Sequence, residues 1–413
     1  MSSFAATLIA SLLIAPGDVV VRGDLVHTVS GPAIADGYVL IRDGDIAAVG
    51  RADELVLDGD ERVHHARIVT PGLVDARGTV GLTGQYNIPH DQDMLEGSKP
   101  MQPQLRAIDA YNPQERLVEW VRGFGTTTVH TGHAPGALIS GRTFIVKTAG
   151  DTVNDAVLVP DAMVSCTLGP AAQKKDGSPG NRSKGIAMLR QKLMDAQHWV
   201  REGALPEEEV GAEDGKRDGP RKRDLEMEAL AGVLDRQMPL LVYANRAQDI
   251  ANAVRLAQEF GIAMVLDGGA ELYMVLDELK AAGVPVLTHP PMIRMYEERQ
   301  NAAFTTPAKL ADAGIPMAIQ TGYESYVPKV RVLVFEAGHA AAHGLGFERA
   351  LKACTLDAAR ILGIDDRVGS IEPGKDADLA LWDGDPFEWT SHCTGVYIDG
   401  KAYDASDCMD GAS

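Results

Sequence analysis

The sequence is poor in cysteine, and its few cysteines form no recognisable pattern. Cys166, Cys354, Cys393 and Cys408 lie far apart in the chain, without a Cys-x-x-Cys spacing. Such a distribution excludes a zinc knuckle and a disulfide framework. Only Cys393 and Cys408 are close enough along the chain for a bridge to be worth testing.

Positive charge is also in short supply. Lysine and arginine number 39 against 58 aspartates and glutamates, which gives a formal net charge of -19. A chain with this charge repels phosphate backbones and anionic lipid surfaces. We therefore expect no nucleic-acid partner.

Long apolar runs are missing beyond the N-terminus. The first residues, 1–16, contain an apolar stretch from Phe4 to Ala15 that has the length of a secretory signal core and ends in small residues, but lacks a basic start. This segment predicts export to the periplasm or another extracytoplasmic compartment, with no membrane insertion after processing. The alternative is a cytoplasmic protein with an extra N-terminal helix.

What the sequence does contain is a β-rich segment at each end. Residues 18–68 and 370–405 consist of strand-sized apolar runs separated by Gly and Asp turns, as in "GYVLIRDGDIAAVG" and "TGVYIDGKAYD". Two such segments around a long middle predict one composite β-sandwich built from both ends of the 413-residue chain.

The middle, residues 69–369, alternates strand and helix patterns. Strand-like runs such as "TTTVHT", "PLLVYAN" and "IPMAIQT" are separated by helix-like stretches that close with Gly. About eight strands can be counted, which predicts an α/β fold of the (β/α)₈ TIM-barrel type, with function in the loops after the strands. Residues 171–225 are charge-dense and interrupt this rhythm, which indicates an exposed insertion around a short amphipathic helix at 186–201.

Two motifs at opposite ends of the chain carry a family resemblance. "VTPGLVDA" at the first barrel strand and "GSIEPGKDADLALWDGDP" near the C-terminus resemble the amidohydrolase superfamily, particularly its imidazolonepropionase-like and related bacterial branch. The resemblance covers nearly the whole chain. It implies a TIM barrel with a composite β-sandwich and the hydrolysis of non-peptide C–N bonds, with zinc as the family's metal.

The residues expected to bind that metal are replaced. The family's first strand ends in Asp-x-His-x-His, whereas here Asp75 is followed by Arg77 and Thr79. Arginine has no lone pair to donate, and threonine is a weak ligand. The other strand ends offer no better donors at the corresponding positions: Ser165, Tyr243, Asn245, Asp267 or Gly268, and Gly322. Since a metal needs three or four good donors, we predict neither a metal site nor another cofactor.

Three histidines are the candidate catalytic residues. His130 and His133 follow the second strand, although an i, i+3 pair on extended chain does not converge on one ion, and backbone contacts are their alternative role. His289 follows the seventh strand, where strand ends line the site. Its alternative role is to stabilise the turn before two prolines.

Five residues are the candidate substrate-binding groups at the barrel mouth. Arg77 can supply charge to a carboxylate substrate or form a structural ion pair with Asp75 or Glu324. The full set is Arg77, Tyr243, Asn245, Tyr323 and Glu324. His339 and His343 have the helical i, i+4 spacing of zinc ligands, but no glutamate of an HExxH motif lies between them, and packing against the barrel is the simpler role.

Two functions from different classes remain open. One is a hydrolase that acts on a C–N bond of a small cyclic amide or dipeptide-like substrate in a rebuilt or metal-free site. The other is a noncatalytic barrel that binds a small ligand or pairs with an active relative. A homo-oligomer is a further expectation.

Overall fold

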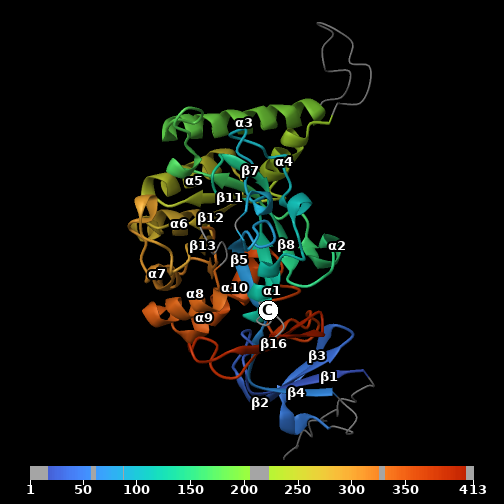
Figure 1. The fold of residues 1–413 in the computed structure, drawn as a ribbon. Coiled ribbons are helices and arrows are strands. Elements are labelled where there is room, and N and C mark those ends of the chain that lie inside the picture. Colours follow the sequence, from blue (N-terminus) through green and yellow to red (C-terminus); the bar gives the residue numbers. More distant parts are fainter. Residues whose placement is uncertain (1–16, 57–61, 87, 205–222, 325–330, 406–413) are drawn as a thin grey trace, which may run out of the picture.

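The computed structural model describes residues 17–56, 62–86, 88–204, 223–324 and 331–405. The apolar N-terminal segment and Cys408 therefore lie outside the described residues. A β-rich body occupies one end of the molecule and an α/β body forms the rest (Figure 1). Among the described residues, no helix is long and apolar enough to cross a membrane.

Both ends of the chain contribute to one seven-stranded sheet. Its order is β17-β16-β15-β4-β1-β2-β3. The strands are β1 (Val19–Val26), β2 (Ile34–Arg42), β3 (Asp45–Arg51), β4 (Arg62–Pro71), β15 (Leu379–Trp382), β16 (Cys393–Ile398) and β17 (Lys401–Asp404). The N-terminal strand β4 pairs antiparallel with the C-terminal strand β15. The expectation of a composite β unit is confirmed by this pairing.

The Asp-Gly pairs in this sheet form its tight hairpins. Asp43 and Gly44, between β2 and β3, have φ values of 52° and 95°. Residues of positive φ at both central positions give the turn whose twist matches that of the flanking strands. The hairpin predicted from "RDGD" is therefore present.

The α/β body has the barrel architecture that the strand-helix alternation predicts. β10 (Val164–Thr167), β11 (Leu240–Ala244), β12 (Met264–Gly268), β13 (Val286–Thr288) and β14 (Met317–Ile319) are parallel neighbours in this order. β5 (Leu73–Gly78) and β6 (Thr126–Thr131) form a second parallel pair. Parallel strands end at the same edge, so their carboxyl ends converge.

One position in the ring departs from the all-parallel expectation. β7 (Ile139–Arg142) and β8 (Phe144–Lys147) are two halves of one extended segment, and they join β10 and β6 respectively, both antiparallel. The segment therefore bridges the two parallel groups, and β9 (Val157–Val159) pairs with β8 outside them. The apolar run "TFIVKT" contains strand β8, which runs antiparallel to its neighbour β6.

The remaining gap in the ring lies between β14 and β5. No ladder pairs these two described strands. The backbone nitrogen of Gly322, just after β14, nevertheless donates to the carbonyl of Arg77 on β5 at 2.9 Å. The ends of the two strands are thereby held together at the mouth of the barrel.

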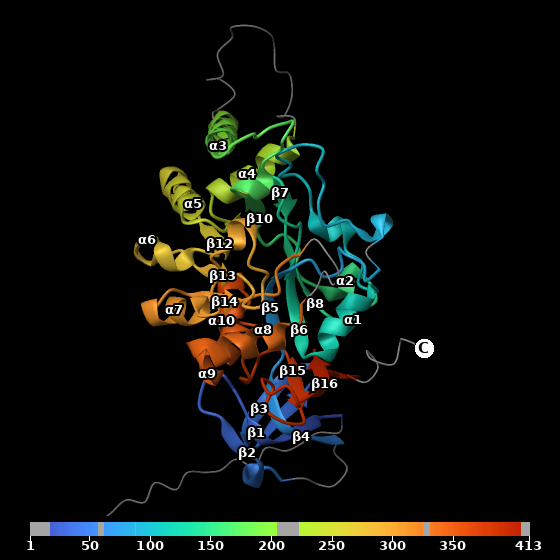
Figure 2. The same cartoon turned by 60° about the vertical axis from the view of Figure 1, so that its left-hand side comes forward.

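Helices cover the outside of the strands (Figure 2). They are α1 (Arg116–Gly123), α2 (Val153–Ala156), α3 (Arg182–Ala204), α4 (Leu225–Leu234), α5 (Ala247–Phe260), α6 (Leu276–Ala282), α7 (Thr306–Ala313), α8 (Leu333–Ala340), α9 (Phe347–Ala353) and α10 (Leu356–Leu362). Short turns of helix lie at Ala52–Glu54, Pro89–Asp91, Ala107–Ala110, Pro170–Ala172, Leu272–Met274, Glu297–Arg299 and Ala341–Leu345. Within the predicted insertion, α3 has 23 residues and is longer than expected. It lies at the end of the molecule farthest from the seven-stranded sheet.

The strands alternate between an outer and an inner set of core side chains. Val242, Leu266 and Val286 belong to the large core shared with the surrounding helices. A separate buried cluster combines residues of α10 with inward-facing residues of β11 to β14, which alternate along these strands with the residues of the large core. These inward-facing residues are Leu241, Val265, Leu287 and Ala318. Successive side chains of a strand point to opposite faces. The residue two positions after each member of this cluster therefore lies on the same face, at the mouth of the barrel.

Candidate functional site

A pocket lies where the strands of the barrel end. It is lined by residues at or just after the carboxyl ends of β5, β11, β12, β13 and β14: Arg77, Gly78, Thr79, Tyr243, Asn245, Asp267, Gly268, His289, Pro290, Gln320, Gly322 and Tyr323, with Pro135 and Ile293. Its cavity volume is about 20 Å³, and a single water molecule needs roughly 10–15 Å³ by this measure. The pocket is therefore narrow.

The strand register explains which side chains face this pocket. Tyr243, Asp267, His289 and Gln320 each come two residues after a member of the inner core cluster, Leu241, Val265, Leu287 and Ala318. A step of two residues keeps a side chain on the same face of a strand. The apolar layer thus supports a polar layer directly above it.

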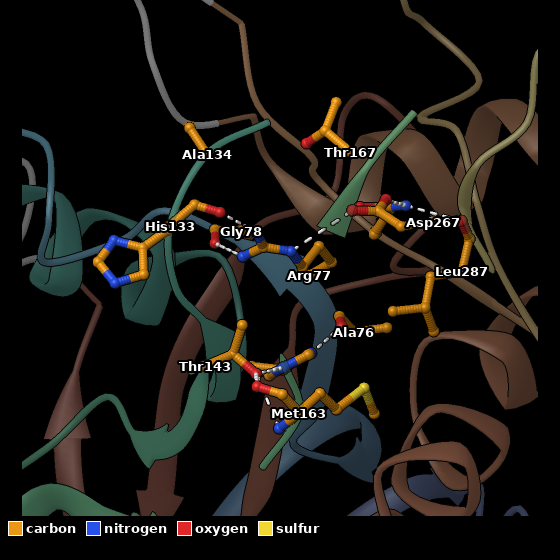
Figure 3. A network of polar contacts seen from close by, with 12 residues as sticks. Ala76, Arg77, Gly78, His133, Ala134, Thr143, Met163, Thr167, Asp267 and Leu287 are labelled. Atoms are coloured by element: carbon orange, nitrogen blue, oxygen red, sulfur yellow. Dashed lines mark hydrogen bonds and ion pairs between the residues drawn. The ribbon is translucent and has the colours of Figure 1, made fainter. Parts of the chain in front are cut away.

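Arg77 is the central cation of the site. It is 3% exposed. Its Nη1 donates to the carbonyl of Gly78 at 2.7 Å, its Nη2 donates to the carbonyl of His133, and its Nε lies 3.5 Å from Asp267 Oδ2 (Figure 3). Burial lowers the pKa of Arg77 while Asp267 and Asp75 oppose this effect. An arginine retains its proton in such a setting.

The partner of Arg77 differs from the expectation. A structural ion pair was expected with Asp75 or Glu324, but the ion-pair contact is with Asp267, on β12. The Asp75 carboxylate instead accepts hydrogen bonds from the backbone and hydroxyl of Thr321 and from the backbone of Arg77. Glu324 pairs with Arg331 at 2.8 Å. Asp75 thus joins β5 to the end of β14.

Asp267 is held from two sides. Gln320 Nε2 donates to Asp267 Oδ1 at 2.8 Å and to the carbonyl of Leu287 at 2.7 Å. Burial raises the pKa of Asp267, and Arg77 and Gln320 oppose the rise. Arg77, Asp267 and Gln320 therefore form one chain of polar contacts across the pocket.

His289 is the one candidate catalytic histidine that lines the pocket. Its Nδ1 donates to the carbonyl of Pro290 at 2.9 Å, while Nε2 has no hydrogen-bond partner among the described residues. Burial lowers its pKa, so the ring is neutral at pH 7. The expected turn contact and the position in the pocket are both present.

The other two histidines are not brought into the pocket. His130 is fully buried, and its two ring nitrogens contact the carbonyl of Ala76 at 2.8 Å and the hydroxyl of Thr143 at 2.7 Å. Burial lowers its pKa to about 3 and that of His133 to about 4, and Arg77 adds to both shifts. Figure 3 shows the His133 carbonyl directed toward Arg77 and its ring turned away. The bonding pattern of His130 fits the structural alternative.

The substrate-binding candidates divide in a similar way. Arg77, Tyr243, Asn245 and Tyr323 line the pocket, whereas Glu324 is absent from its lining. Sequence reasoning did not select Thr79, Asp267 and Gln320 as site residues. Asp267 and Gln320 could have been found by counting two residues beyond the last inward apolar residue of each strand.

His339 and His343 lie on the outer helices. Their rings pack on each other at 4.3 Å and on Phe304. In the part of the chain that the structure describes, no group of three or more His, Cys, Asp or Glu could hold a metal ion. The histidine pair therefore has the packing role that was the simpler expectation.

Comparisons with known proteins agree with this geometry. The model of the Amidohydrolase family matches residues 226–403. An amidohydrolase from Thermotoga maritima MSB8 of known structure is 27% identical with a TM-score of 0.86, over 94% of this chain and 100% of that one. The chain belongs to the amidohydrolase superfamily.

Two further relatives of this amidohydrolase-superfamily chain are each 25% identical to it. Imidazolonepropionase from Solibacter usitatus (strain Ellin6076) aligns over 92% of the chain and 94% of its own length. Amidohydrolase tasK from Hapsidospora irregularis aligns over 89% of the chain, which spans 40% of that longer protein. The resemblance to the imidazolonepropionase-like branch is thus supported over most of the chain.

Proposed function

We propose that this protein is a hydrolase that cleaves a non-peptide C–N bond of a small cyclic amide or dipeptide-like substrate in a site where Arg77 stands in place of a catalytic metal. Superfamily membership supports the reaction class. The imidazolonepropionase relatives, whose name points to a cyclic amide, support the substrate class. The pocket at the strand ends supports the location of the site.

The single observation that supports a reaction without a metal ion is the buried contact between Arg77 and Asp267. The zinc of the family requires lone-pair donors, and the guanidinium of Arg77 has none. Of the pocket-lining side chains, Asp267 and His289 are the strong metal ligands, and the Asp267 carboxylate already contacts Arg77 and Gln320. The donor set does not fit a divalent ion, so we derive no step through one.

The residues present support a simple hydrolytic cycle. The neutral His289 accepts a proton at Nε2 from a water molecule as the water oxygen attacks the amide carbon. The Arg77 cation stabilises the negative charge that develops on the carbonyl oxygen. The C–N bond then breaks, His289 returns the proton to the leaving nitrogen, and a carboxylic acid and an amine are formed, which remain on one ring-opened molecule when the amide is cyclic.

A second candidate function is a noncatalytic barrel that binds a small ligand or pairs with an active relative. Two observations favour it. The pocket is narrow, with about 20 Å³ of free volume. Moreover, Arg77 is engaged by Gly78, His133 and Asp267, so a substrate must compete with these contacts. Export after removal of a signal segment and assembly into a homo-oligomer remain proposals for either function.

Hydrolysis assays separate these candidates. The purified protein is incubated with a panel of five- and six-membered cyclic amides, with a chelator or with added zinc, and ring opening is followed by NMR. We expect turnover that is unaffected by the chelator, is lost in His289→Phe and is retained in His343→Gln, a control at the outer helices. Binding without turnover would favour the noncatalytic barrel, and turnover only with zinc would overturn the metal-independent site.

A further inference from the structure

Five buried polar atoms of pocket-lining residues have no hydrogen-bond partner among the described residues; Arg77 Nε and Asn245 Nδ2 are donors, and the other three can accept. These three are His289 Nε2, Gln320 Oε1 and Thr79 Oγ1. Each of their residues is at most 1% exposed. Buried polar atoms are rarely left unpaired in folded proteins, so atoms that face a pocket indicate contacts that a ligand completes.

The neighbouring bonds fix the polarity of two of these atoms. Gln320 uses its Nε2 to donate to Asp267 and to the carbonyl of Leu287, so the unpaired end of its amide is the oxygen, which only accepts. The carbonyl of Pro290 can only accept, so the proton of neutral His289 lies on Nδ1. His289 Nε2 is therefore a lone pair, and it too only accepts.

The charge in the pocket is already balanced. Arg77 donates to two backbone carbonyls and lies 3.5 Å from the Asp267 carboxylate. A carboxylate ligand would have to displace Asp267 from this cation and would face the two unpaired acceptors. An uncharged ligand that donates hydrogen bonds meets neither obstacle.

We propose that the pocket selects uncharged ligands that present at least two N–H or O–H donors, of which a cyclic urea is the simplest chemical class, and that it discriminates against carboxylates. The two donors meet Gln320 Oε1 and Thr79 Oγ1, and His289 Nε2 is left to accept the proton of the attacking water. This inference rests on the proposed function in one respect, because it takes the pocket to be the substrate site. It replaces the earlier expectation that Arg77 receives a carboxylate substrate.

A series of five-membered rings tests the proposal directly. Imidazolidin-2-one has two N–H donors, pyrrolidin-2-one has one and cyclopentanone has none, while their size is nearly the same. Binding to the full-length protein is measured by titration in protein-observed NMR, with acetate as the anionic probe. We expect affinity to fall by about fivefold or more with each donor removed, which corresponds to the net worth of one hydrogen bond.

Substitutions at Thr79 supply the matched variants. Thr79→Val keeps the shape and removes an unpaired hydroxyl, so the melting temperature should not fall, while affinity for imidazolidin-2-one should decrease severalfold. Thr79→Ser retains the hydroxyl and should retain binding. Equal affinity for the three rings, tighter binding of acetate, or no binding of imidazolidin-2-one would each overturn the proposal. Binding of imidazolidin-2-one without hydrolysis of any cyclic amide would instead contradict only the hydrolase.

Discussion

At the scale of single residues, the buried position of Arg77 has a structural consequence that can be measured. The guanidinium is buried beside Asp267. Removing one partner of a buried ion pair leaves an uncompensated charge, which costs about 3–5 kcal/mol. Arg77→Met should lower the free energy of unfolding by about this amount in chemical denaturation.

Two further variants make this prediction specific. Arg77→Met combined with Asp267→Asn should lose less stability than the sum of the single variants, because the unpaired carboxylate is gone. Arg22→Met removes one partner of an exposed pair with Asp36 and should change the free energy of unfolding by no more than about 1 kcal/mol. A silent Arg77→Met would mean that Arg77 reaches solvent and carries no structural charge.

The sequence showed what Arg77 cannot do, but the ion-pair partners that it suggested, Asp75 and Glu324, are not the one that the structure shows. The chemistry of a side chain is evident from its type, so a non-ligand at this position could be recognised. Asp267 lies 190 positions along the chain, on a different strand, and the strand-to-strand register that brings it within 3.5 Å is not written in local periodicity. His130 was selected for its place after a strand, but its side chain faces Ala76 and Thr143.

At the scale of elements, α8 fastens a loop that forms one wall of the pocket. Glu336 on α8 accepts a hydrogen bond from the backbone of Met292 at 2.8 Å and pairs with Arg331 at 3.1 Å. Arg331 also contacts Glu324, which lies 4.0 Å from Arg299. Pro290, Ile293 and Tyr323 of these same segments line the pocket. This ion-pair network therefore supports the site without entering it.

The pH dependence of stability tests this element. Burial raises the pKa of Glu336 from 4.5 to about 7, the neighbouring Glu324 adds to the rise, and Arg331 opposes it. Because the folded pKa lies above the unfolded one, the stability that this group contributes is present below pH 4.5 and is lost as the pH rises through about 7.

Glu336→Gln removes this titration. The difference in unfolding free energy between wild type and variant should therefore shift in favour of the variant between pH 5 and pH 8, by on the order of 1–3 kcal/mol. Glu259→Gln is the control, since Arg190 lowers the pKa of that exposed glutamate. A pH-independent difference for Glu336→Gln would show that Glu336 is ionised across the range.

Strand direction was the part of the fold that element patterns could not supply. The run "TFIVKT" has the apolar character of a buried strand, and that character is the same whichever way the strand runs. Only its pairing with β6 and β10 reveals that β7 and β8 are antiparallel to their neighbours. The alternation of strands and helices predicted the barrel class correctly, but it did not predict that one strand segment runs in the opposite direction.

At the scale of the whole molecule, Lys147 joins the barrel to the seven-stranded sheet. It projects from β8, is 4% exposed, and its Nζ contacts Asp376 at 2.6 Å, Asp378 at 3.1 Å and Asp399 at 2.5 Å. Burial raises the pKa of Asp378 to about 6, and Lys147 opposes the rise. One buried cation thus holds three carboxylates from the C-terminal part of the chain.

Lys147→Met should leave the buried Asp378 carboxylate without its cation, whereas Asp376 keeps its ion pair with Arg367. We expect a loss of about 3–5 kcal/mol in the free energy of unfolding by denaturant. Lys174→Met, at an exposed position, should change stability by no more than about 0.5 kcal/mol. If Lys147→Met matched Lys174→Met, the contact between barrel and sheet would not depend on this cluster.

The pairing of the two chain ends, in contrast, was accessible from sequence. Turn residues at regular spacing marked both β segments, and a chain of this length with β-rich ends around an alternating middle has few compact arrangements. The same periodicity could also have located the last inward side chains, of which Asp267 and Gln320 were missed. What could not be predicted was which of them contact each other, since that depends on twist and register across the barrel.

The central claim is that this superfamily member functions without the metal of its relatives, and metal analysis of the purified protein tests it most directly. Protein prepared without chelators and without added metal is measured by inductively coupled plasma mass spectrometry. We expect far less than one equivalent of zinc or any other transition metal per chain. Tightly held metal at about one ion or more per chain, as in catalytic sites with three protein ligands, would contradict it.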